Sequence, residues 1–139
     1  MFATRRKSPS KPGFLQRLVH NVAGNTAAIM AAALLPLAGF TGAALDTARL
    51  YVVKVRLQQS CDAGALAGRK MMTGTSLTED NKTQAKLFFD NNFKSGWFKT
   101  SDVSFAASDT ADGQVMGTAA VKVPVTLMSI FGAGPTTLT

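Results

Sequence analysis

The chain of 139 residues has little of what active sites and disulfide-rich folds use, with one cysteine and one histidine. Because a disulfide needs two cysteines, an internal one is excluded, and the lone Cys61 on a predicted helix is typical of a small buried side chain, with a disulfide to another chain as the alternative. His20 has no second metal ligand or nucleophile near it in the sequence, which is typical of a polar interfacial residue. We therefore expect no catalytic residue, no metal and no cofactor.

Acidic residues are also few, and none precedes Asp46. The eight in the chain are scattered over predicted helix, cap and turn positions, and none has the spacing of a metal site or an acid/base pair. The net charge of +7 comes mostly from the first 17 residues. The basic cluster at 5–11 has no interleaved aromatic residue, and no nucleic-acid-binding signature follows, so we expect no nucleic acid partner.

What the chain does have is a long uncharged stretch, from Leu18 to Leu45. Its inner part, Thr26 to Leu45, contains 20 residues without an ionisable side chain. A helix rising about 1.5 Å per residue would cover roughly the 30 Å hydrocarbon core of a bilayer with these residues. The sequence therefore predicts a membrane-spanning helix over residues 21–45, with the lipid bilayer as a partner. A cleaved signal sequence ending at Gly42-Ala43-Ala44 is the rival interpretation, although the run is longer than the usual apolar centre of about 7 to 15 residues.

The basic residues around this stretch predict an orientation, because Lys and Arg near a spanning helix tend to remain in the cytoplasm. Three basic residues lie in the 20 positions after the run, against five before it. We therefore expect a cytoplasmic tail at 1–20 and an extracytoplasmic domain at 46–139. The orienting residues are Arg5, Arg6, Lys7, Lys11 and Arg17.

Small residues recur at four-residue spacing within the apolar run, which leaves shallow helix faces where another helix can approach closely. Pro36 lacks a backbone donor and is expected to kink the helix. The alternative for the small residues is that Ala and Gly are simply common in spanning helices. The predicted packing positions are Ala27, Ala31, Ala38, Gly39 and Gly42.

Asp46 and Arg49 form a predicted charge pair where the chain leaves the lipid. They are three residues apart, so both lie on one helical face. The functional hypothesis is that they set the depth of the helix and present charge to neighbouring subunits. An ordinary solvated border is the alternative.

The remainder predicts an α+β domain that begins with a continuation of the spanning helix. No Pro or turn cluster interrupts the chain before Thr73-Gly74, so the helix should extend to about Arg69. Ser76 and Glu79 have the spacing of a capping box, which predicts a second helix ending near Phe93. The apolar stripe of the long helix is expected at Leu50, Val53, Leu57 and Cys61.

Two alternating segments after the second helix predict an antiparallel β-hairpin with one apolar face. They cover residues 102–107 and 114–126, and turn residues at 109–113 separate them. Pro124 should lie at a strand end or a sheet edge. Thr136–Thr139 begins another strand, which either frays or belongs to a longer relative. The aromatic residues Phe88, Phe89, Phe93, Trp97 and Phe98 are expected in the core.

Several blocks of the chain, taken in order, resemble the N-terminal region of TadG-like proteins, which belong with the TadE-like proteins of the tight-adherence (Flp pilus) system. The likeness is strong over about residues 14–70 and looser over the hairpin that ends in Met128–Gly132. The blocks are Gly24-Asn25-Thr26-Ala27-Ala28-Ile29, the apolar run with Pro36, Ala44-Leu45-Asp46-Thr47-Ala48-Arg49, and Val55 to Ala67.

This resemblance implies a single-pass protein of the bacterial inner membrane that takes part in pilus assembly or secretion. Its implied partners are other membrane proteins of that system, and self-association is a further expectation. Prepilins have a Glu at the fifth position after their cleavage Gly, whereas Ile29 stands at that distance from Gly24. The chain therefore resembles an anchor more than a filament subunit. It also lacks the D-x-S-x-S pattern of longer relatives, so no metal site is carried over. The alternative is a secreted or periplasmic binding module with residues 1–44 as its signal sequence.

Overall fold

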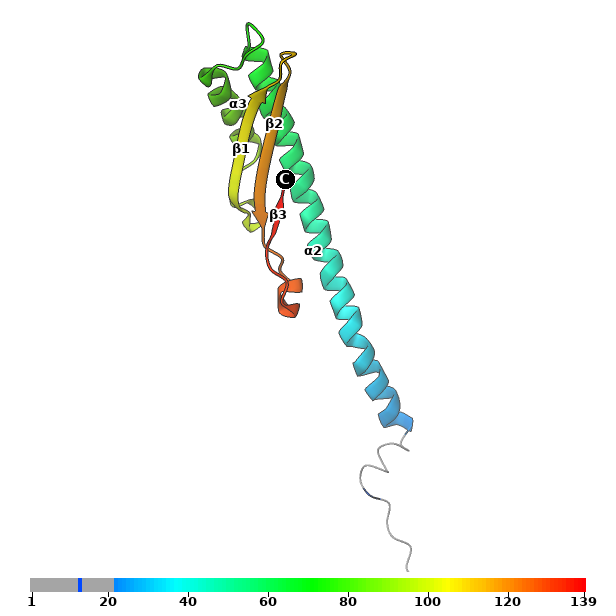
Figure 1. Cartoon of the computed structure of the whole chain (residues 1–139). Helices are drawn as coiled ribbons and strands as arrows, with labels where there is room; N and C mark the ends of the chain where they lie inside the picture. The colour runs from blue at the N-terminus through cyan, green and yellow to red at the C-terminus, as the bar shows by residue number, and fades with distance from the viewer. Residues whose placement is uncertain (1–12, 14–21) are drawn as a thin grey trace, which may run out of the picture. The chain divides into compact units, whose positions relative to one another are not determined.

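A computed structural model describes Gly13 and residues 22–139 (Figure 1). His20 and all five orienting basic residues lie outside these described residues. The elements are the helices α2 (Val22–Met71) and α3 (Glu79–Asn92), the short 3-10 helices η1 (Trp97–Lys99) and η2 (Met128–Phe131), and the strands β1 (Ser101–Asp109), β2 (Val115–Val123) and β3 (Thr136–Leu138). The predicted α+β class is confirmed. The chain divides after Phe40 into two compact units.

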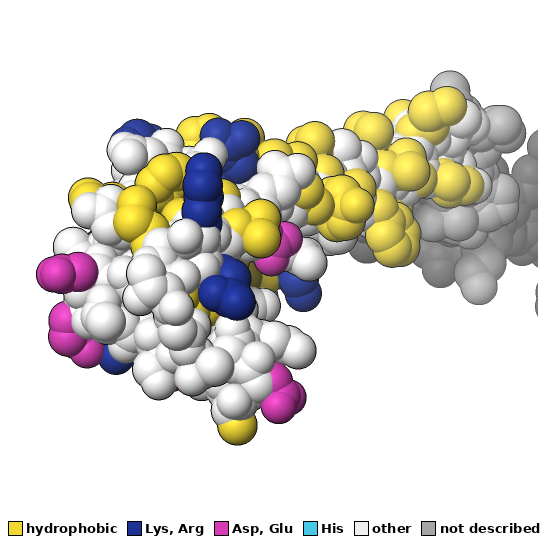
Figure 2. All heavy atoms as spheres, turned by 90° about the horizontal axis from the view of Figure 1, so that it is seen from above, with side chains coloured by type: hydrophobic (Ala, Val, Ile, Leu, Met, Phe, Trp, Pro, Cys, Tyr) yellow, Lys and Arg dark blue, Asp and Glu magenta, His cyan; other side chains and the backbone are white. Residues whose placement is uncertain are grey.

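In the first unit, α2 leaves its large apolar side chains exposed. Their exposed fractions run from 59% at Leu37 to 76% at Leu35. Figure 2 shows apolar side chains gathered along a part of the helix where no charged side chain is visible. Among the described residues, α2 is the one helix long and apolar enough to cross a membrane. It is continuous through Pro36, and the kink at that residue stays a prediction.

The second unit, Thr41–Thr139, has its core where two helices meet one face of a sheet. The predicted stripe of α2 supplies the buried Val53 and Leu57, with Leu50 and Cys61 partly buried beside them. This confirms the helical spacing read from the sequence. The rest of the buried cluster comes from α3 and β2, with Phe89, Phe93, Ala119, Val121 and Val123.

The sheet is antiparallel with strand order β1-β2-β3, and the predicted hairpin forms its first two strands. Phe105 of β1 lies opposite Ala119 of β2, so the alternating apolar residues share the face that the helices cover. β2 ends at Val123, directly before Pro124, because a proline has no N–H to donate to the ladder. β3 pairs with the last part of β2, which confirms the strand expected at the end of the chain.

Glycines allow α2 to approach both α3 and the sheet closely. A Cβ added at Gly64 would lie 2.7 Å from the Phe105 ring and 3.0 Å from the Ala85 carbonyl oxygen. One added at Gly117 of β2 would lie 2.9 Å from the Cys61 sulfur. Since real Cβ atoms essentially never come this close to other atoms, glycine is required where these elements touch.

Two predictions about this unit are wrong in detail. The cap of α3 is Thr78, whose hydroxyl accepts from the Asn81 N–H, and Ser76 is not the cap. Leu77 is buried against α2, so the chain turns into the helix only after it. Of the five aromatic residues expected in the core, three are substantially exposed. These are Phe88, Trp97 and Phe98, at 47%, 38% and 43%.

Candidate functional site

The carboxylate of Asp46 binds three consecutive backbone N–H groups from the segment that follows β2. Thr126 donates to Oδ1 at 3.0 Å, and Leu127 and Met128 donate to Oδ2 at 2.9 and 2.8 Å. The side chain is almost fully buried, with 5% exposed. We call these contacts the Asp46 clasp. They join α2, at the end of the apolar run, to a segment about 80 residues further along the chain.

The Asp46 clasp caps the N-terminus of η2. Leu127, the residue at the cap position, provides no side-chain hydrogen bond there. The N–H groups at a helix start lack intrahelical partners and carry partial positive charge. The N–H of Met128 is the largest influence holding the pKa of Asp46 below its ordinary value. Burial opposes it, while the N–H groups of Thr126 and Leu127 and the charge of Arg49 lower the pKa further. The carboxylate is therefore ionised at neutral pH.

Arg49 makes its hydrogen bonds to the loops beside the clasp. Its Nη1 donates to Thr126 Oγ1 at 2.6 Å, and its Nη2 donates to the Phe98 carbonyl oxygen. Its Cζ lies 5.8 Å from the centre of the Phe98 ring, within cation–π range. Over the described part of the chain, the ion pairs within 4.0 Å do not include one between Asp46 and Arg49. The predicted pair thus faces a shared loop instead of forming a direct side-chain bridge.

The backbone at Phe98 and Lys99 is strained where Arg49 holds it. Both residues have positive φ, 53° and 59°, a region that costs a residue with a Cβ about 1 kcal/mol or more. The Arg49 hydrogen bond to the Phe98 carbonyl stabilises this conformation and keeps the ring beside the guanidinium. Asp46 and Arg49 together therefore connect α2, the 97–99 turn and the 126–128 segment.

Gly42 is the predicted packing position whose partner the structure identifies, and that partner is in the same chain. A Cβ at Gly42 would lie 3.0 Å from the Leu127 Cβ, so the small residue makes room for the segment held by the clasp. Ala27, Ala31 and Ala38 are exposed and Gly39 is half-buried. Contacts of these four with other helices stay predictions.

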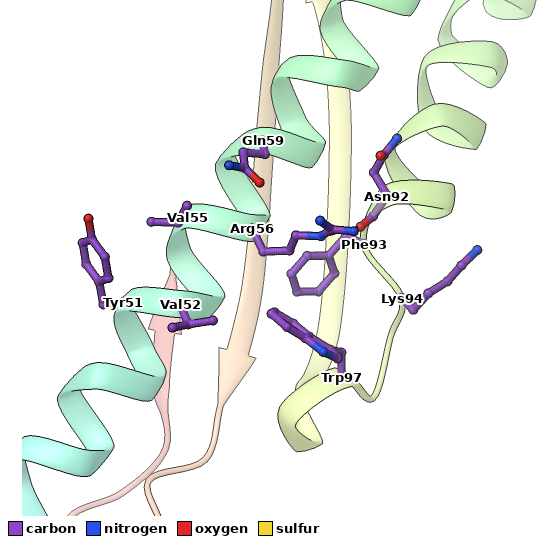
Figure 3. A pocket seen from close by; sticks show the side chains of 9 residues that line it. All are labelled: Tyr51, Val52, Val55, Arg56, Gln59, Asn92, Phe93, Lys94 and Trp97. Atoms are coloured by element: carbon purple, nitrogen blue, oxygen red, sulfur yellow. The ribbon is translucent and has the colours of Figure 1, made fainter.

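An open apolar groove of about 510 Å³ adjoins the site between α2 and the segment after α3. Phe93 and Trp97 meet edge to face, with ring centres 6.2 Å apart, and Arg56 lies beside them (Figure 3). Arg56 Nε donates to the Asn92 carbonyl oxygen at 3.0 Å, so its polar group is used to join the two helices. The remaining lining residues are Tyr51, Val52, Val55, Gln59 and Lys94.

Comparison with protein families gives one match, over residues 24–72, to the family described as putative Flp pilus-assembly TadE/G-like. This part of the chain is similar to TadE/TadG-like proteins. The comparisons with curated proteins and with solved structures gave no match. The matched segment is nearly the whole of α2, so it includes the apolar run, Asp46, Arg49 and the buried stripe of the domain.

The described part of the chain holds no group of three His, Cys, Asp or Glu side chains that could bind a metal. Cys61 is half-buried against β2, and burial, with the charge of Asp62 adding to it, raises the pKa of the thiol. Its contacts with Gly117 account for it as a small packing residue, as the sequence suggested.

The Asp46 clasp itself was missed by reasoning from the sequence. Its acceptor was identified, but the donors are backbone N–H groups, which leave no trace in residue types. One signal was available: the chain has no charged residue after Lys122, so a second uncharged segment follows β2.

Proposed function

We propose that this TadE/TadG-like protein is a single-pass anchor of Flp-type pilus assembly in the bacterial inner membrane. Residues 21–45 span the bilayer, residues 1–20 lie in the cytoplasm and residues 46–139 form an extracytoplasmic domain. The observation that carries the proposal is the extent of the family match, which covers both the exposed apolar run and the half of α2 that builds the domain core. One helix would thus connect lipid to the folded domain.

The exposed apolar side chains of the first unit support the spanning role, because leaving such a surface in water opposes folding and promotes association. The small residues Ala27, Ala31, Ala38 and Gly39 would give other membrane proteins of the assembly a close approach in lipid. Asp46 and Arg49 would stand at the boundary and set the depth of the helix.

The contact between Gly42 and Leu127 also favours a retained helix over a cleaved signal sequence. Cleavage after Ala44 would remove Gly42 and place a new α-amino group on Leu45, the residue directly before Asp46. The domain would lose the contact between Gly42 and Leu127. Asp46 would then lie in the first, frayed turn of the shortened helix. A secreted module with the open groove as its binding surface is the alternative function.

Sequencing the mature N-terminus from isolated membranes tests the anchor directly. A chain that starts at its first residue supports it, a start at Leu45 supports the secreted module, and a start at Asn25 indicates prepilin-like processing. Protease added outside spheroplasts should degrade residues 46–139 and spare the tail, and the reverse pattern would overturn the orientation.

The assembly role is tested by deleting the gene and counting surface pili by electron microscopy. Loss of pili that is restored by the wild-type chain supports the role. A deletion strain with normal pili and normal surface attachment would contradict it, whatever the topology of the protein.

A further inference from the structure

We propose that the uncharged segment after β2 inserts into the outer interface of the bilayer, as a second membrane contact beside the spanning helix. This inference rests on the proposed function, because it takes residues 21–45 as the membrane span. It concerns η2 and its neighbours, and the occupant of their exposed apolar surface is lipid.

The first argument is the level at which η2 lies along α2. β2 runs down the helix towards the apolar run: Val115 lies near Gly68, Gly117 touches Cys61, and Leu127 touches Gly42. Gly42 is inside the uncharged run, one turn before Asp46. The start of η2 is therefore held at the level of the last turns predicted to lie in lipid. Figure 1 shows η2 at this end of the sheet, beside α2.

The second argument is the chemistry of the segment. Residues 123–139 contain no charged side chain, so nothing in them opposes transfer to the interface through an ionised group. Ile130 and Phe131 are 77% and 68% exposed. Such side chains on an ordered turn fit the boundary between headgroups and acyl chains, where apolar groups gain from burial.

The third argument is the set of residues one helical turn further from the apolar run. Arg49 bonds the Phe98 carbonyl and Thr126, which places the 97–99 turn beside the segment. Trp97 and Phe98 are partly exposed there, next to the basic Lys99. Aromatic rings accompanied by basic side chains are typical of the headgroup layer, where cations meet anionic lipids. The order along α2 is therefore apolar first and aromatic and basic next, as in an interface.

Depth-dependent quenching by brominated lipid tests this in the full chain. The native Trp97 is replaced (Trp97→Phe), and a single reporter is introduced as Phe131→Trp, Met116→Trp or Phe40→Trp. All three positions are exposed, at 68%, 58% and 74%. Met116 is the matched control, because its neighbour Gly117 lies beside Cys61 and Ala65, roughly 22–28 Å beyond Asp46 along the helix axis.

Each variant is reconstituted in vesicles made of equal parts phosphatidylethanolamine and phosphatidylglycerol, brominated near the top of the acyl chain. We expect the reporter at 131 to lose most of its fluorescence and shift to the blue, and the reporter at 116 to do neither. Quenching at 131 no stronger than at 116, with strong quenching at 40, would overturn the inference and leave the anchor intact. Absence of quenching at 40 as well would overturn the proposed function. A blue shift at 131 without quenching would assign the surface to a second copy of the chain, against the inference.

Circular dichroism of each variant in the same vesicles verifies the fold. If Phe131→Trp is misfolded, Ile130→Trp is the second reporter, and the same outcomes apply to it.

Discussion

The two ends of α2 share many small and apolar residue types but differ in charge and in surroundings. Both are rich in Ala, Gly and Leu, yet the side chains of the first unit are exposed whereas Val53 and Leu57 of the second are buried by α3 and the sheet. In the second unit, glycine is required at position 64, because the Phe105 ring and the Ala85 carbonyl leave no room for a Cβ. The comparison teaches that the same residue types serve an exposed helix surface and a buried one. The order of charges and the elements that follow decide which it is.

The strongest test of this difference is to place the same charge in each half of α2. Leu57→Arg buries an unpaired cation in the core, where Leu57 is 3% exposed, and should cost about 4 kcal/mol or more, so the domain does not fold. Leu35→Arg should leave the domain folded and oppose insertion by about 2.5–3.5 kcal/mol. Urea unfolding of the full chain in detergent and extraction of membranes with carbonate measure the two effects. Loss of the domain fold in Leu35→Arg would show that the halves are not independent.

A smaller change tests the close approach at Gly64. Gly64→Ala adds one methyl group against Phe105 and Ala85, and we expect a loss of about 1–3 kcal/mol in the free energy of unfolding. Gly134→Ala is the matched control, because a Cβ there has no described atom within 4 Å. Urea titration of both variants gives the difference. Equal stability of the two would mean that α2 can move away from the sheet without cost.

The boundary between the halves is tested at the Asp46 clasp. Asp46→Asn keeps the shape of the side chain but turns an N–H₂ group towards N–H donors, so the amides of Leu127 and Met128 should exchange hydrogen faster. Amides of β1 and β2 should change little. Asp62→Asn, an exposed carboxylate on the same helix, is the control. Unchanged exchange at 127 and 128 would remove the clasp as the anchor of this segment.

The smallest expected effect is the acid dependence of the same contact. The folded pKa of Asp46 is lowered, so its stabilising contribution is complete above the unfolded pKa of about 3.9 and is lost as pH falls through the folded value. The difference in urea midpoint between wild type and Asp46→Asn should stay constant from about pH 7 to about pH 5, and shrink below roughly pH 4. A difference that shrinks near neutral pH would assign the effect to another group.

Much of the fold could be predicted from periodicity. The helix continues through Asp46 because no Pro or turn cluster interrupts its apolar pattern of period 3.6 there. The hairpin, with Val103 and Phe105 facing inward, follows from a pattern of period 2, and its second strand ends directly before Pro124. The cap of α3 was misplaced, because Ser76 has Glu79 at the capping-box distance, whereas Thr78 has Asn81 there. The burial of Leu77 against α2 decides between them, and no local pattern records that contact.

The sequence by itself determined the apolar run, its basic flank, the amphipathic continuation and the likeness to TadE/TadG proteins, because hydropathy, charge and residue order are properties of the chain. Only the tertiary structure decided what Asp46, Gly42 and Arg49 contact. Their partners are main-chain groups of Thr126, Leu127, Met128 and Phe98, the hydroxyl of Thr126 and the Leu127 side chain. Backbone N–H and C=O groups are the same in nearly every residue, so folding alone selects which of them meet a carboxylate or a guanidinium.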